Sequence, residues 1–204
     1  MKAAALGVRV HSGWGALVAV TGERGAAAVI HRQRVVVTDS KVPGAVQPYH
    51  RAEKMKLPEA EKYLADFASA ADRLAAAAVG EIVQALEERG FRVAGSAILL
   101  ASGRPLPPLA AILRSHAMIH TAEGEFFRMI FRRAFGTVGL PVYGFREREL
   151  EHRAEEALGR PAAELRQDLQ TLGKNLGPPW TADQKNAALA AWIVLASGPA
   201  RAAK

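Results

Sequence analysis

Residues 6–20 read LGVRVHSGWGALVAV, which is two apolar runs joined by a short Gly-rich turn. Apolar runs of this length favour β-strands, and we expect the two strands at residues 3–11 and 16–20. A polar turn then leads into a third predicted strand at residues 26–39. Because short turns join antiparallel neighbours, the chain is expected to open with three antiparallel strands.

A connector and a long helix follow the third strand. Residues 40–56 carry two prolines, His50 and several lysines and arginines, and a connector of this length is either a solvated crossing or a functional segment. Pro58 marks the start of a helix, since apolar residues then recur at helical spacing until Gly90 ends it. Residues 91–101 predict a fourth strand, which the right-handed crossover rule places parallel to the first strand.

The C-terminal half is predicted to be mostly helical. We expect a helix, a short strand and three further helices, at residues 109–135, 140–145, 146–158, 161–172 and 181–196 respectively. Thr181 and Gln184 have the spacing of a capping box at the start of the last helix. The alternation of strands and helices predicts the α/β class.

Composition narrows the class of protein. The 204 residues include no cysteine, which excludes disulfide scaffolds, thiolate metal sites and cysteine nucleophiles. Neither a secretory signal pattern nor an apolar run of about 20 residues occurs, so we expect a bacterial-type cytoplasmic protein with no membrane partner. The net charge of +7 favours either a nucleic-acid partner or basic residues scattered over solvated faces, and a homo-oligomer stays open.

Four stretches resemble the ribonuclease-H-like fold, and more narrowly the RuvC-type Holliday-junction resolvases. They are Leu6-Gly7-Val8-Arg9 with the turn after it, residues 98–108, Leu140-Pro141-Val142-Tyr143, and residues 177–195. The resemblance implies a mixed sheet of three antiparallel strands, followed by helix, strand, helix, strand and helices. It also implies a single ribonuclease-H-like domain over residues 1–198, with residues 199–204 as a flexible tail.

The same resemblance implies a nuclease site that this sequence does not reproduce. In that family, carboxylates from the first strand, the end of the fourth strand and the last helix hold two divalent metal ions. The matching positions here are Arg9, Leu99 or Leu100, and Ala187 or Ala188, with Asp183 one turn earlier. No Asp or Glu occurs in residues 1–22. We therefore expect a degenerate site, and a binding or structural module for nucleic acid or an acidic protein rather than an enzyme.

A histidine pair supports an alternative interpretation. His116 and His120 are four residues apart on the predicted helix 109–135, and Glu123 joins the same face. Two imidazoles and a carboxylate are candidate ligands for zinc or a similar metal, although a hydrogen-bonded polar face has the same pattern. Under this alternative the protein is a diverged metal-dependent phosphodiesterase or nuclease, with candidate catalytic residues His120, Glu123, Glu125 and Asp183. Only this alternative needs a cofactor, a divalent metal.

Basic residues near the first strand suggest a candidate anion site. Arg9, His11 and Arg32 come from adjacent predicted strands, and Lys185 lies in the first turn of the last helix. The strand residues would bind a phosphate or another acidic group if their side chains share a face, and the N-terminus of the last helix with Lys185 is a separate candidate for an anion. The competing interpretation pairs these side chains with acids on the helices. A different α/β fold with a small-molecule pocket is a third hypothesis.

Overall fold

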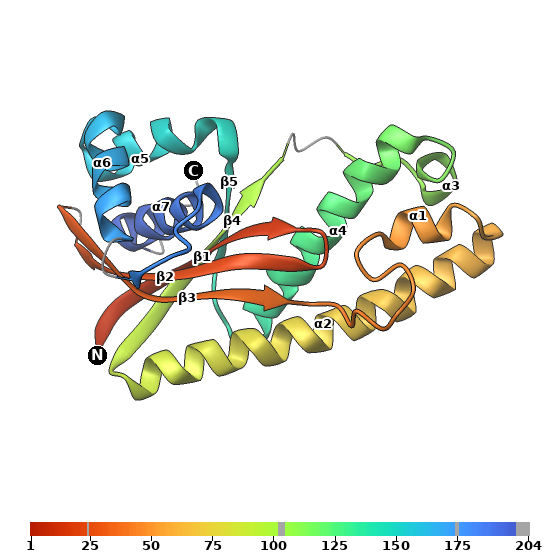
Figure 1. The fold of residues 1–204 in the computed structure, drawn as a ribbon, viewed down its shortest axis with the longest axis horizontal. Helices are drawn as coiled ribbons and strands as arrows, with labels where there is room; N and C mark the ends of the chain where they lie inside the picture. The colour runs from red at the N-terminus through yellow and green to blue at the C-terminus, as the bar shows by residue number, and fades with distance from the viewer. Residues whose placement is uncertain (24, 102–104, 174–175, 199–204) are drawn as a thin grey trace.

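The computed structural model describes residues 1–23, 25–101, 105–173 and 176–198 and contains a five-stranded mixed sheet (Figure 1). Its strands are β1 (Lys2–His11), β2 (Trp14–Glu23), β3 (Ala26–Val36), β4 (Phe91–Leu100) and β5 (Val142–Arg146). The order across the sheet is β3-β2-β1-β4-β5. The pairs β1–β2 and β2–β3 are antiparallel, and the pairs β1–β4 and β4–β5 are parallel. The predicted antiparallel trio and parallel fourth strand are thus confirmed.

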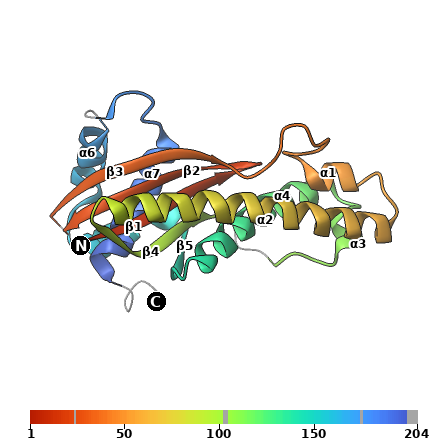
Figure 2. The same cartoon turned by 90° about the horizontal axis from the view of Figure 1, so that it is seen from below.

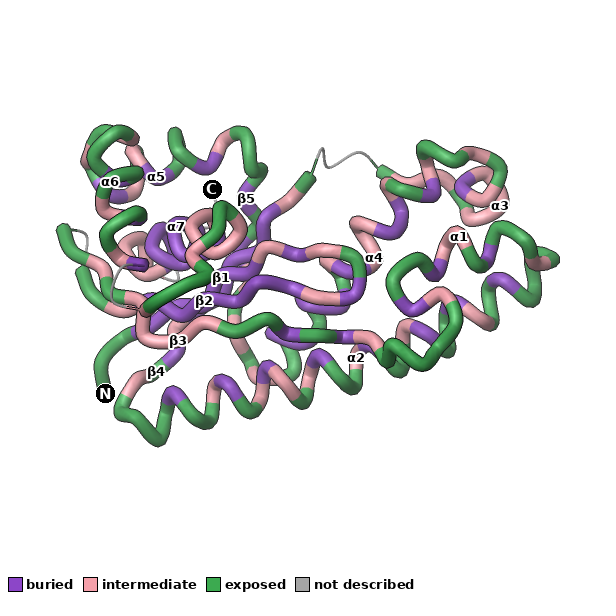
Figure 3. The backbone as a smooth tube through the Cα atoms, in the orientation of Figure 1, coloured by how far each residue is buried: buried purple, intermediate pink, exposed green. Residues whose placement is uncertain are grey.

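Helices cover both faces of this sheet (Figure 2). One face carries α2 (Leu57–Glu88) and α4 (His116–Thr137), and the other carries α5 (Leu150–Leu158), α6 (Ala162–Leu172) and α7 (Ala182–Ser197). Each layer has its own buried core against the central strands, as the purple segments in Figure 3 show. The α/β class predicted from the sequence is therefore confirmed.

The alternation of side chains along β1 decides which residues meet α7. Leu6, Val8 and Val10 pack into the core with α2 and α4. The period of two then puts Gly7 and Arg9 on the opposite face, towards α7. At Gly7 an ideal Cβ would lie 1.9 Å from the carbonyl oxygen of Ala187, so only glycine allows this close approach. The first turns of α7 consequently lie directly over the end of β1.

A helical extension projects beyond the sheet. The 32 residues of α2 are about 48 Å long, whereas the 10 residues of β1 span about 33 Å. The surplus of α2 packs with α1 (Pro48–Ala52), α3 (Leu109–Ile112) and the first half of α4 (Figure 1). Small buried clusters hold these pieces together, and Tyr49 meets Phe126 edge-on at 5.9 Å between ring centroids.

Several predicted boundaries are wrong. The expected helix at 109–135 is two helices, because Ser115 has extended backbone angles and its amide bonds back to the carbonyl of Ile112. The expected helix at 146–158 begins later, since β5 runs to Arg146 and a 3-10 turn, η1 (Glu147–Glu149), precedes α5.

The bounds of two strands and the structure of the connector also differ from the prediction. β2 is longer than residues 16–20, and β3 ends at Val36, three residues before the predicted end. The connector at 40–56 contains α1, which begins at Pro48, one of the two prolines of that segment. The predicted tail, residues 199–204, lies outside the described residues. Among the described helices, none is both long and apolar enough to cross a membrane.

Candidate functional site

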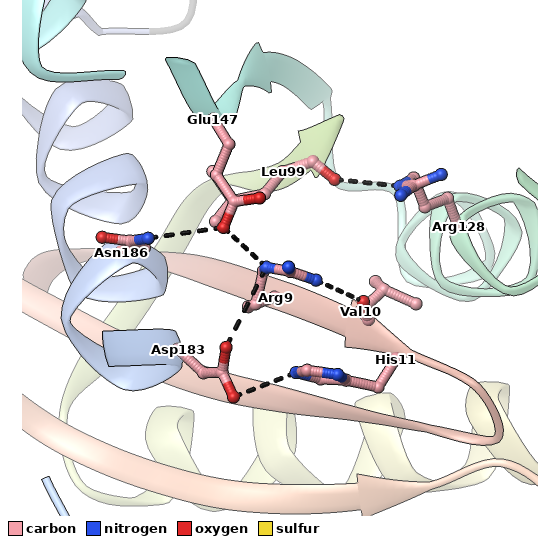
Figure 4. A network of polar contacts seen from close by, with 8 residues as sticks. All are labelled: Arg9, Val10, His11, Leu99, Arg128, Glu147, Asp183 and Asn186. Carbon is pink, nitrogen blue, oxygen red and sulfur yellow. Dashed lines mark hydrogen bonds and ion pairs between the residues drawn. The ribbon is translucent and has the colours of Figure 1, made fainter. Parts of the chain in front are cut away.

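The end of β1 carries a network of hydrogen bonds and ion pairs (Figure 4). The Nε of Arg9 donates to Oε1 of Glu147 at 2.7 Å, and its Nη1 donates to the carbonyl oxygen of Val10 at 2.8 Å. Oδ1 of Asp183 lies 4.0 Å from the same Nε. The guanidinium therefore stands between two carboxylates that come from η1 and α7.

A second basic side chain extends this network along the strand. Nε2 of His11 lies 3.0 Å from Oδ2 of Asp183, and the His11 ring stacks on Trp14 with centroids 4.2 Å apart. The guanidinium of Arg34 covers Trp14 at 3.9 Å from a ring centroid. Both carboxylates of the network thus have a basic partner, since Arg9 holds Glu147 and His11 holds Asp183.

The positions that the family resemblance assigned to acids are apolar and mostly buried. The side chain of Leu99 packs in the core under α7, as do Ala187 and Ala188, while Leu100 lies against Gly144 on the next strand. The carbonyl oxygen of Leu99 accepts from Nε of Arg128 at 3.2 Å. No carboxylate reaches the end of β1 from these positions.

Glu147 is the residue of this network that the sequence did not single out. It was expected inside a helix at 146–158, but η1 turns it toward the end of β1. The amide of Asn186 on α7 also donates to its Oε1, at 3.4 Å. The one feature of the sequence that could have pointed to Glu147 is a run of four charged residues, Arg146 to Glu149, directly after the predicted strand at 140–145.

The candidate anion-binding residues are brought together only in part. Arg9 and His11 share the network with Asp183. Arg32 lies apart from them and donates to the carbonyl oxygens of Leu176, Pro178 and Pro179 in the loop before α7.

Lys185 lies half-buried in the first turn of α7, two residues after Asp183. The capping box of Thr181 and Gln184 that fixes this turn is present as predicted. Glu147 already balances the positive charge of the Arg9 guanidinium, so an anion that binds Arg9 would have to displace this carboxylate.

A second cluster of titratable side chains lies in the helical extension. His50 comes from α1, and His116 and His120 come from the first two turns of α4. One ring nitrogen from each lies within 4.8 Å of the other two, and Nε2 of His116 is 3.1 Å from Nε2 of His120. Three imidazoles on two helices therefore converge on one point.

Glu123 supports this cluster from inside. Its Oε1 accepts from the backbone amide of His50 at 3.2 Å and lies 2.9 Å from Nδ1 of the same residue. Glu123 is only 3% exposed, and Ser96 is the other polar residue with that degree of burial among the described residues. Burial raises the pKa of the neighbouring Tyr49 phenol, and the negative charge of Glu123 acts in the same direction.

The sequence singled out three of these four side chains. The histidine pair and Glu123 followed from helical spacing, whereas His50 lies 66 residues before His116 in the connector. The other two candidate catalytic residues lie elsewhere. Glu125 pairs with Arg128 at 2.8 Å, and Asp183 belongs to the network at the end of β1.

Comparison with known proteins identifies the fold. No family model matches the chain, and no curated protein matches its sequence. The structure of Thermus thermophilus RuvC in complex with a Holliday junction substrate matches with a TM-score of 0.51 and 15% identity, covering 95% of this chain and 92% of that one. A second Thermus thermophilus RuvC structure matches with a TM-score of 0.52 and 13% identity, over 95% and 94% of the two chains. The chain is thus similar in fold to RuvC, which confirms the predicted ribonuclease-H-like mixed sheet.

Proposed function

We propose that this protein is a nucleic-acid-binding module that keeps the ribonuclease-H-like fold without two-metal nuclease chemistry. The observation that carries the proposal is Arg9, which stands at the end of β1 and bonds to Glu147 at 2.7 Å. The nucleic-acid part rests on analogy with a solved neighbour that is described with a Holliday junction substrate.

The residues at the end of β1 do not fit a pair of divalent metal ions. Two such ions need several anionic oxygens, and a fixed guanidinium at the same place repels them. Here the two nearby carboxylates, Glu147 and Asp183, already face Arg9 and His11. No metal-dependent step is therefore assigned to these residues.

One stretch of the helical extension is basic, and its charge supports binding to a phosphate backbone. Residues 40–58 and 105–122 include one acid, Glu53, against five lysines and arginines, whereas the adjoining turns of α2 and α4 carry further acids, among them Glu59 and Glu61. These five are all exposed, and they are Lys41, Arg51, Lys54, Lys56 and Arg114. Exposed cations attract nucleic acid in a salt-dependent, sequence-independent way. This basic stretch of the extension is thus the surface that we assign to nucleic acid.

Binding and cleavage should be measured on the same samples. Fluorescence anisotropy with branched DNA, single-stranded DNA and RNA at two salt concentrations should show binding that weakens as salt rises. The same substrates should stay intact with Mg²⁺ or Mn²⁺. Absence of binding even at low salt would overturn the nucleic-acid part. Cleavage that is abolished by Glu147→Gln would overturn the claim about the nuclease site.

A charge-matched pair of variants locates the binding surface. The double variant Lys54→Glu/Lys56→Glu should weaken binding and reduce the slope of log K against log salt by about 0.9 for each duplex phosphate that the protein no longer neutralises. The control Lys2→Glu/Arg92→Glu makes the same charge change at the other end of the sheet, where both side chains are exposed. Equal weakening by both double variants would mean that net charge alone, and not the extension, governs binding.

A further inference from the structure

The cluster in the helical extension has the donor set of a metal site. We propose that His50, His116 and His120 bind one Zn²⁺ or a similar divalent transition-metal ion, and that Glu123 positions His50. This proposal does not rest on the nucleic-acid function proposed above.

The spacing of the ring nitrogens fits a single ion. Zinc binds imidazole nitrogen at about 2.0–2.1 Å in a tetrahedral arrangement, which places neighbouring ligand nitrogens about 3.3 Å apart. Nε2 of His116 and Nε2 of His120 are 3.1 Å apart, and all three ligand atoms lie within 4.8 Å of one another. The His50 nitrogen, which lies within 4.8 Å of the other two, would complete three corners of the tetrahedron by moving toward them.

The contact between Glu123 and His50 is the one expected behind a metal ligand. Metal-bound histidines generally donate their second ring N–H to a carboxylate or carbonyl, which fixes the tautomer and the ring orientation. Nδ1 of His50 lies 2.9 Å from the Glu123 carboxylate, and in the tautomer that donates this N–H to the carboxylate, Nε2 keeps the free lone pair. Burying a carboxylate costs free energy, and the buried carboxylate of Glu123 orients the His50 ring.

The chemistry of the ligands selects the ion. Three imidazoles suit zinc, copper, nickel and cobalt, whereas magnesium and calcium prefer oxygen ligands. His116 and His120 are exposed, so the fourth position of a tetrahedral ion would be open to water. An ion at this point would join α1 to α4 within the extension, and its binding would stabilise the folded state through linkage.

Metal binding should be measured on the full chain after treatment with a chelator. Isothermal titration with Zn²⁺ should give one site per chain, and Co²⁺ should give the visible absorption of a tetrahedral complex. Zn²⁺ should also raise the melting temperature, while Mg²⁺ at the same concentration should not. Absence of stoichiometric Zn²⁺ binding by the wild-type chain would overturn the proposal and leave a hydrogen-bonded histidine cluster.

Variants separate this cluster from adventitious binding to surface histidines. His116→Gln and His120→Gln change exposed side chains and should each abolish the one-to-one binding and the Co²⁺ spectrum. The matched control is His152→Gln, which changes an exposed histidine on α5. Nε2 of His152 lies 3.4 Å from Oε1 of Glu156, so this histidine also has a carboxylate neighbour. Equal loss of binding from the control would contradict the assignment.

The positioning role of Glu123 has its own readout. Glu123→Gln keeps three imidazoles and should weaken Zn²⁺ affinity by about 10- to 100-fold, as outer-shell changes do, while the Co²⁺ complex stays tetrahedral. Circular dichroism of each variant without metal shows whether it is folded. A folded Glu123→Gln chain with wild-type affinity would remove Glu123 from the site but leave the three ligands.

Discussion

The end of β1 and the tip of the helical extension both gather basic and acidic side chains, but they balance charge differently. At the end of β1, Arg9 and His11 each face a carboxylate, so the acids are compensated by the chain itself. In the extension, three imidazoles face each other and one buried carboxylate. In the first arrangement each acid faces a basic side chain, and in the second the imidazole nitrogens face one another. The difference shows that the chemistry of a site depends on which charges the fold has already paired.

The largest expected effect comes from the glycine that brings α7 onto β1. Gly7→Ala would place its Cβ 1.9 Å from the carbonyl oxygen of Ala187, and the overpacking should destabilise the fold by about 3 kcal/mol. Gly80→Ala is the control, because nothing lies within 4 Å of its Cβ and alanine should stabilise α2 by about 1 kcal/mol. Urea denaturation measures both changes. A Gly7→Ala chain as stable as wild type would contradict the close approach of α7.

A smaller effect is expected from reversing the charge at Arg9. Arg9→Asp would place three carboxylates together at the end of β1, with like charges costing about 1 kcal/mol of stability without metal. Mn²⁺ should then raise the melting temperature of this variant but not that of the wild type, because the acids no longer have Arg9 as a partner.

The control for this prediction is Arg9→Asp/Glu147→Gln, which removes one of the three carboxylates. Its response to Mn²⁺ should be weaker than that of Arg9→Asp in the same thermal melts. An equal rise in melting temperature with Mn²⁺ for wild type and Arg9→Asp would contradict the claim that pairing with Arg9 occupies these acids.

The smallest effect concerns His31 on β3, a histidine outside both clusters. Burial lowers the pKa of His31 below 6.5, the nearby charge of Arg89 adds to this, and the hydrogen bond to Gln33 opposes it. Below pH 6.5 the unfolded chain therefore takes up this proton more readily than the folded chain, so stability falls as pH drops from 6.5 toward the folded pKa.

The test of this prediction is the pH dependence of unfolding. His31→Gln should remove the contribution of His31 and make the stability of the protein less sensitive to pH below 6.5. An NMR titration of the His31 ring should show a midpoint below 6.5 in the folded wild type. A midpoint at or above that value would contradict the effect of burial.

Local sequence was enough to predict the sheet but not the contacts at either cluster. The apolar runs of β1 and β2 and the short turn between them determine the antiparallel pairing, because neighbours along the chain are neighbours in space. Arg9 was likewise placed correctly at the end of β1 from its own strand. These features depend on patterns within about 20 residues of one another.

Contacts between distant segments were missed for a physical reason. His50 reaches α4 only because α1 folds back onto it, and no periodicity in residues 40–56 encodes that contact. Glu147 was assigned to a helix, since its charged neighbours suit a helix surface as well as a turn. The break before His116 was missed because residues 109–135 have apolar spacing on both sides of Ser115.

The helix α4 connects the two clusters. Its 22 residues form a rod about 33 Å long, with His116 and His120 at one end and Arg128 about 12 Å beyond His120 along the axis. Arg128 holds the carbonyl of Leu99, at the edge of the β1 network (Figure 4). One continuous helix therefore joins the histidine pair to the hydrogen bond at Leu99, so the two clusters share a structural element although they are far apart in the sequence.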